Sequence, residues 1–231
     1  MKESLEQKKK RVLKIMKRLR KTYPDAKCAL DFSNPLELLF ATILSAQCTD
    51  KRVNKVTPAL FRRYKTAEDY AQADPKELQG LIRSTGFYKN KAKNISGAAT
   101  GIVERFGGKV PARQVDLVSL PGVGRKTANV VLGSAFGIPG LTVDTHMIRL
   151  GNRLGLTKNQ DAVKIEFDLM KIVPQKEWSR YSHWIIHHGR QRCPARNPDC
   201  EHCEIQGLCP SAGKFETKRP RARRFFSVPE G

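Results

Sequence analysis

Two residues able to act as a catalytic pair stand on either side of an apolar segment in the middle of the chain. Lys126 follows the glycine turn Leu120-Pro-Gly-Val-Gly124, and Asp144 stands in Val143-Asp-Thr-His just before another helical pattern. A lysine amine can attack carbon to form an imine, and a fixed carboxylate can stabilise positive charge or accept a proton. The sequence therefore offers a nucleophile and a carboxylate, if folding brings them together.

Lys126 is expected in the first turn of a helix whose neighbouring residues are mostly apolar. A helix N-terminus carries partial positive charge, so it disfavours the cationic form of a lysine, and burial adds to this effect. Attack at neutral pH requires the pKa to fall from about 10.4 to near 7. The helix dipole alone is too weak for this, so burial and cationic neighbours such as Arg125 must contribute. The alternative is a lysine that contacts a phosphate.

Asp144 is in the position of an N-cap, because a helical pattern begins at the next residue. A purely structural cap is the plain interpretation. The two roles are compatible, since a capping carboxylate stays ionised and fixed in direction.

Four cysteines cluster near the C-terminus, at Cys193, Cys200, Cys203 and Cys209. Four soft ligands on one short segment suit either a tetrahedral zinc ion or a cubane iron–sulfur cluster, and thiolate chemistry does not separate the two. Two disulfides are disfavoured, because no signal peptide precedes this basic chain. The segment is therefore predicted to bind a metal.

The composition favours a polyanionic partner. The net charge is +21 over 231 residues, and the isoelectric point is near 10.0. Nucleic acid is favoured over a membrane, because no long apolar run is present. Architectural or ribosome-like binding remains open on charge alone. The expected location is intracellular, in the cytoplasm or nucleoid, because the lysine-rich N-terminus lacks an apolar signal segment.

The elements that position these residues are all predicted to be helical, without strands or internal repeats. At the glycine turn, Pro121 ends one short helix, while Gly122 and Gly124 permit backbone angles that other residues resist. Such a helix-hairpin-helix presents free N–H groups to a phosphate, although a tight core turn would look similar. The other helices are predicted over 5–22, 35–47, 50–64, 67–71, 75–82, 89–106, 145–154, 162–173 and 177–189.

One turn, with two aromatic rings beside lysines, suits insertion into a stacked duplex. Phe87-Tyr-Lys89, with Lys91 beyond it, places aromatic rings beside lysines, so the rings could replace base stacking while the lysines hold phosphates. The alternative is that both rings plug the core. Gln47 ends an apolar helix, where a backbone-bonded amide is the plain interpretation. His183 and His187 are interpreted as packing residues, because the acidic partner of a helical zinc site is absent.

Taken together, these stretches resemble the endonuclease III family of DNA glycosylases, within the helix-hairpin-helix glycosylase superfamily. The resemblance extends from about Leu13 to Pro210. The matching stretches are Ser45–Gln47 with Thr49-Asp50, Gly86–Ala92, Leu120–Ala128, Val143–His146 and Cys193–Cys209.

The resemblance implies removal of oxidised pyrimidines from DNA, followed by nicking at the abasic site. Lys126 matches the Schiff-base nucleophile, Asp144 the essential carboxylate, and Gln47 the residue that fills the gap left by an extruded nucleotide. The four cysteines match a [4Fe-4S] loop. The expected partner of this monomer is double-stranded DNA with damaged pyrimidines or abasic sites. The expected DNA-binding residues are Gln47, Phe87, Tyr88, Lys89, Leu120, Gly122, Val123, Gly124, Arg125, His146 and Arg196.

The implied fold is all-α with two helical domains. Residues 28–138 are expected to form a six-helix domain containing the hairpin, residues 1–27 with 139–212 an iron–sulfur domain, and residues 213–231 a basic tail. Asn197 and Asp199 make the cysteine loop less basic than the family suggests. Two alternatives remain: an adenine-specific relative, which lacks the lysine nucleophile and has an added C-terminal domain, and a noncatalytic DNA-binding module.

Overall fold

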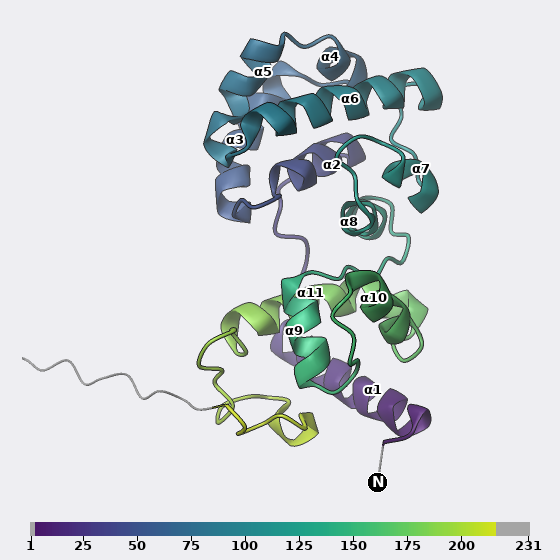
Figure 1. Ribbon diagram of the computed structural model, residues 1–231, viewed down its shortest axis with the longest axis vertical. Coiled ribbons are helices and arrows are strands. Elements are labelled where there is room, and N and C mark those ends of the chain that lie inside the picture. The colour runs from purple at the N-terminus through teal and green to yellow at the C-terminus, as the bar shows by residue number, and fades with distance from the viewer. Residues whose placement is uncertain (1–2, 216–231) are drawn as a thin grey trace, which may run out of the picture.

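The computed structural model describes residues 3–215, and this part of the chain is helical without a strand, as predicted. Figure 1 shows two groups of helices stacked along the long axis of the molecule. The helices are α1 Leu5–Thr22, α2 Pro35–Leu44, α3 Asp50–Arg63, α4 Ala67–Ala71, α5 Pro75–Ile82, α6 Tyr88–Phe106, α7 Gln114–Val118, α8 Arg125–Ala135, α9 Thr145–Arg153, α10 Ala162–Met170 and α11 Trp178–Gln191, with short 3-10 turns η1 Arg83–Thr85, η2 Gln175–Glu177 and η3 Gln206–Leu208.

The first group, here called the upper core, is formed by α2 to α8 around buried residues between Leu30 and Leu132. Helix α2 lies at its centre, with Leu38–Leu44 all buried, because almost every one of its residues is apolar. The side chain of Asn34 accepts a hydrogen bond from the Glu37 amide, and Pro35 occupies the first helical position. The sequence predicted this start, but the helix ends at Leu44, three residues earlier than expected.

The second group, here called the lower core, joins the two ends of the chain. Helix α1 packs against α11, and the core also includes α9, α10 and Ile205. Four apolar residues at helical spacing form the buried stripe of α1: Val12, Ile15, Met16 and Leu19. Its other faces carry the lysines, so the basic helix is docked by one stripe.

The chain crosses between the cores twice, after Tyr23 and before Leu141. The predicted domain limits at 27/28 and 138/139 fall in these crossings and stay predictions. Most of the predicted basic tail, residues 216–231, lies outside the described residues. None of the described helices combines the length and apolar character needed to cross a bilayer.

Candidate active site

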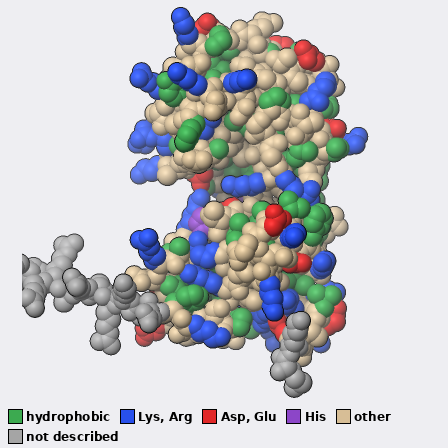
Figure 2. Space-filling view, viewed as in Figure 1, with side chains coloured by type: hydrophobic (Ala, Val, Ile, Leu, Met, Phe, Trp, Pro, Cys, Tyr) green, Lys and Arg blue, Asp and Glu red, His purple; other side chains and the backbone are tan. Residues whose placement is uncertain are grey.

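A cleft of about 100 Å³ lies between the two cores, and both Lys126 and Asp144 line it. Lys126 is the second residue of α8 in the upper core, whereas Asp144 caps α9 in the lower core. Figure 2 shows a waist between the two lobes, with Lys and Arg side chains and a histidine at its edge. The fold therefore brings the predicted pair into one compartment from opposite sides.

The Asp144 carboxylate is held by two hydrogen bonds. Oδ1 accepts from the Met147 amide at 2.9 Å, and Oδ2 lies 2.9 Å from His146 Nδ1. Burial by itself would raise the pKa of Asp144, but these two hydrogen bonds and the charges of His146 and Lys126 lower it below its usual value. The carboxylate is thus ionised, fixed in direction and within the electrostatic reach of Lys126.

Lys126 itself is exposed, so the burial expected from its apolar neighbours is wrong for the lysine side chain. The neighbours behave as predicted, since Ala128, Val131 and Leu132 are buried. Gly124 caps α8 without a side chain, which leaves the first turn of this helix open to an external acceptor. Lys126 therefore projects into the cleft beside a helix N-terminus.

The two glycines of the hairpin play different roles. Gly122 has φ +72°, and a Cβ there would lie 2.7 Å from Asn94 Cβ, so both its conformation and its packing exclude a side chain. Gly124 has φ −87°, an ordinary value, so the expectation of a special backbone angle there is wrong. Leu120 and Val123 are buried, so they can contribute to DNA binding only through the backbone.

Arg125, which the resemblance placed among the DNA-binding residues, forms a bidentate ion pair that joins the upper core to the lower core. Its Nε and Nη2 lie 2.6 and 3.0 Å from the two carboxylate oxygens of Glu166 on α10. Glu166 is 3 % exposed and also accepts from Asn129 Nδ2 at 3.0 Å. This pair ties the start of α8 to the lower core, and the DNA contact of Arg125 stays a prediction.

Two exposed turns of the upper core have left-handed backbone at a non-glycine residue. Gln47 has φ +52° and Phe87 has φ +48°. Phe87 is 64 % exposed, so it does not plug the core, whereas Tyr88 is half-buried against the upper core. Within the described chain, no hydrogen bond fixes the Gln47 side chain, so the expected alternative of a backbone-bonded amide is not what forms. Such strained, exposed positions often mark functional sites.

The remaining predicted residues differ in their surroundings. Lys89 and Arg196 are exposed, and His146 is half-buried beside Asp144. Lys91, which was expected to hold a phosphate, is instead buried, so that expectation is wrong. Its ammonium group donates to two backbone carbonyls and does not face solvent.

Sequence reasoning missed two cleft residues, because it interpreted His183 and His187 as packing residues. Both line the cleft with Lys126 and Asp144. Burial, reinforced by the charge of His187, lowers the pKa of His183 to about 4, so it is neutral near pH 7. At the same cleft, Arg190 Nη2 and Asp50 Oδ2 form an ion pair of 2.8 Å between α11 and α3. The spacing of four residues, which puts both histidines on one face of a helix, was the feature of the sequence that could have indicated a shared site.

The four cysteines line one cavity in the lower core. Arg153 Nη1 donates to Cys193 Sγ at 3.1 Å, and His188 Nε2 lies 3.6 Å from Cys203 Sγ, so a guanidinium group and an imidazole nitrogen face two of the sulfurs. In residues 3–215 no three ligand side chains converge on a point that could hold a single ion. Four soft donors that line one cavity form a thiolate set suited to a metal centre.

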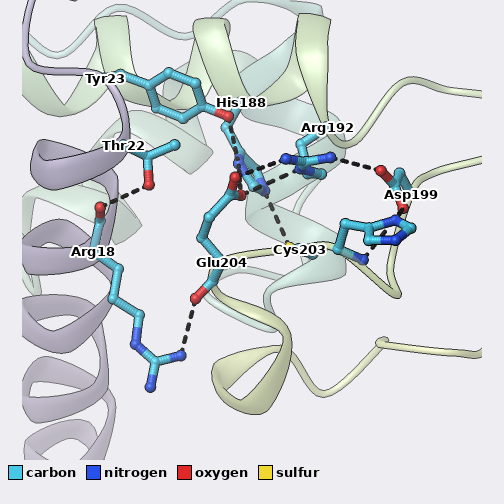
Figure 3. A network of polar contacts seen from close by, with 9 residues as sticks. Arg18, Thr22, Tyr23, His188, Arg192, Asp199, Cys203 and Glu204 are labelled. Carbon is cyan, nitrogen blue, oxygen red and sulfur yellow. Dashed lines mark hydrogen bonds and ion pairs between the residues drawn. The ribbon is translucent and has the colours of Figure 1, made fainter.

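A polar network attaches the cysteine segment to the rest of the lower core (Figure 3). Arg192 holds Glu204 through its Nη2 at 2.9 Å and Asp199 through its Nη1 at 2.6 Å. Tyr23 Oη lies 3.2 Å from His188 Nδ1, on the opposite side of the ring from Cys203. His202 Nδ1 lies 2.8 Å from Asp199 Oδ1.

Comparison with known proteins gives a consistent result. Residues 40–175 match the family described as HhH-GPD superfamily base excision DNA repair protein. Endonuclease III of Synechocystis sp. is 59% identical over 206 residues, covering 89% of this chain and 94% of that protein. Endonuclease III of Bacillus subtilis is 48% identical, covering 85% of this chain and 90% of that protein.

Solved structures agree with these sequence matches. A non-covalent Endonuclease III–DNA complex superposes with a TM-score of 0.85 and 44% identity, covering 89% of this chain and 97% of that chain. A thermostable thymine-DNA glycosylase gives 0.80 at 25% identity, covering 89% and 98% respectively.

Proposed function

The chain belongs to the endonuclease III family of DNA glycosylases/AP lyases, within the HhH-GPD superfamily of base excision DNA repair proteins, and we propose that Lys126 is its nucleophile and Asp144 its essential carboxylate. The observation that carries this proposal is that both residues line one cleft although they come from different cores. A noncatalytic binding module would have no need of this arrangement.

The proposed reaction begins with attack of the neutral Lys126 amine on C1′ of an extruded nucleotide. The C1′–base bond breaks, the base leaves with its bonding electrons, and opening of the sugar ring gives an imine between Lys126 and C1′. A base such as water takes a proton from C2′, the electrons of that C–H bond form a C2′–C3′ double bond, and the 3′ phosphate leaves with the C3′–O bonding electrons, which nicks the strand. Water finally hydrolyses the imine and restores the amine.

Asp144 has two proposed roles in this sequence. Its ionised carboxylate stabilises the positive charge that develops on the sugar, and it accepts a proton from Lys126 once DNA fills the cleft. A carboxylate favours the charged form of a neighbouring lysine, so it does not activate the amine by charge alone. Because Lys126 is exposed in the free protein, bound DNA must supply the desolvation that favours its neutral form.

DNA binding is proposed to involve the hairpin and the two strained turns. The amides at the start of α8 donate hydrogen bonds to a backbone phosphate, since no side chain caps that end. Phe87 is the better wedge because it is 64 % exposed, whereas Tyr88 is half-buried. Gln47 occupies the space vacated by the extruded nucleotide. The proposed substrate is double-stranded DNA with oxidised pyrimidines or abasic sites, bound by a monomer in the cytoplasm or nucleoid.

Cys193, Cys200, Cys203 and Cys209 are proposed to hold a [4Fe-4S] cluster. When bound, such a cluster crosslinks the segment after α11, which has little regular structure of its own. The protein's part is to place four thiolates around one cavity and to direct Arg153 and His188 at their sulfurs. This keeps the neighbouring Arg196 beside the DNA.

Borohydride reduction tests the proposal, because it traps a lysine imine as a stable amine. The wild-type protein should become covalently attached to an abasic-site duplex, and Lys126→Ala should abolish the adduct. Lys109→Ala, which removes an exposed lysine on the loop after α6, is the matched control and should trap normally. An undiminished adduct in Lys126→Ala would place the nucleophile elsewhere.

A further inference from the structure

Lys91 is a buried lysine with an unusual pair of partners. It is 4 % exposed, and its Nζ donates to Leu44 O at 2.8 Å and to Thr85 O at 2.9 Å. Among the described residues it has no carboxylate partner, so its ammonium is compensated by backbone dipoles. Burying a charged group costs free energy unless it is hydrogen-bonded. The buried Lys91 ammonium therefore requires both carbonyls as acceptors.

The two carbonyls stand at the ends of two helical segments. Leu44 is the last residue of α2, and Thr85 is the last residue of η1. A cation at these ends is favoured, because the terminal carbonyls carry partial negative charge and lack partners within the helix. Lys91 therefore joins the ends of two helical segments that lie far apart in the sequence.

Each of these ends leads directly into one of the strained turns. Gln47 (φ +52°) follows Leu44 by three residues, and Phe87 (φ +48°) follows Thr85 by two. The Lys91 backbone amide also donates to Phe87 O at 3.0 Å. One residue thus contacts both sides of the Phe87 turn and the base of the Gln47 turn.

We propose that Lys91 is a positioning residue that fixes the spacing between the Gln47 and Phe87 turns, so that both side chains enter the duplex together. This rests on the proposed function of the two turns and extends it to the residue that couples them. Lys91 touches neither the DNA nor the reacting atoms. Its ammonium acts through the two carbonyls it holds, and insertion of one turn becomes dependent on the other.

The test separates duplex opening from the chemistry at Lys126. Lys91→Met keeps the length of the side chain and removes its donors. Lys93→Met removes an exposed lysine from the same helix and controls for the loss of charge. Two quantities are measured for each variant: borohydride trapping rates on duplex and single-stranded abasic oligonucleotides, and the fluorescence of 2-aminopurine placed opposite the abasic site at saturating protein.

For Lys91→Met, the duplex rate should fall at least about tenfold, as expected from the loss of charged hydrogen bonds. The single-stranded rate should stay at the wild-type value, and the 2-aminopurine signal should decrease. Lys93→Met should keep the wild-type signal at saturation. Lys91→Arg retains a cation but moves its donors, so its duplex trapping rate and 2-aminopurine signal should lie between those of the wild type and Lys91→Met. It replaces Lys91→Met in the test if that variant fails to fold.

Unchanged duplex trapping and fluorescence in folded Lys91→Met would overturn the proposal. Equal losses on duplex and single strands would also overturn it, because they would show damage to the active site as a whole. If the wild-type protein trapped neither substrate, the proposed nucleophile itself would be wrong, which is a different failure.

Discussion

The upper and lower cores solve different structural problems. The upper core is built from one continuous stretch of chain, in which α4 packs on α6 and α2 packs on α8, and the buried residues are mostly apolar. The lower core joins the two ends of the described chain and must hold the segment after α11, whose only helical turn up to residue 215 is η3. There, arginine side chains bond to backbone carbonyls: Arg11 to Leu154 and Leu208, Arg149 to Gly189 and Cys193.

The difference between the cores has a consequence for the active site. Lys126 is fixed by helix packing in the upper core, whereas Asp144 caps a helix of the lower core, which the proposed cluster would crosslink. The relative position of the two residues depends on contacts between the cores, such as the pair of Arg125 and Glu166. Stability of the lower core and activity should therefore be linked.

The largest expected effect comes from removing a cysteine. Cys203→Ala should abolish the visible absorption of the cluster and destabilise the lower core by on the order of 5 kcal/mol, because a metal site contributes directly to folding. Hydrogen exchange should then rise in α9 and α11 but not in α5 and α6. A colourless wild-type protein containing zinc would refute the cluster, and equal exchange in both cores would refute the division between them.

The next effect concerns the contact between the cores. Arg125→Met leaves Glu166 buried without its cation, which should cost about 2–4 kcal/mol of unfolding free energy. Lys171→Met is the control, since its pair with Asp168 lies at the surface (64 % and 29 % exposed side chains) and should cost less than about 0.5 kcal/mol. Chemical denaturation measures both, and a similar small loss in each would remove the proposed role of this pair.

The smallest effect is a difference in acid sensitivity. All five histidines lie at or beyond His146, outside the stretch that builds the upper core. Burial lowers the pKa of His183 to about 4 in the folded protein. Between about pH 6.5 and pH 4, His183 is therefore protonated in the unfolded chain but neutral in the folded protein. The contribution of His183 is thus present above pH 6.5 and falls as the pH drops toward 4.

Hydrogen exchange, measured in each core during thermal unfolding at pH 7 and at pH 5, checks this expectation. The lower core should lose stability over this range and the upper core should not. His183→Gln should reduce the pH dependence of the lower core. An identical acid response in both cores would show that buried histidine is not the cause.

Local features of the fold were predictable from the sequence. The limits of α1, α4 and α5 were predicted to the residue, because capping residues and apolar spacing act within a few positions. Other ends shifted by one to three residues, as at α10, where the apolar run continues beyond the last helical turn. The conformation of Gly124 was predicted wrongly, since a glycine does not reveal which angle the chain adopts.

Long-range relations were harder to predict. The partner of Arg125 is 41 residues away, and the carbonyls that bind Lys91 are chosen by the packing of three separate segments. His183 and His187 have a helical spacing that suits packing and a cleft equally well. The residues of the candidate site were therefore recognisable by type and by family resemblance, while their partners required the folded chain.

The most direct test of the central claim, that the two cores each supply half of the active site, is single-turnover base excision by Asp144→Asn. Asparagine caps a helix about as well as aspartate, so α9 and the lower core should remain intact. We expect Asp144→Asn to bind abasic-site DNA with wild-type affinity. Its single-turnover rate of base excision should fall at least about a hundredfold. Wild-type turnover would instead reduce Asp144 to a cap and contradict an active site shared between the cores.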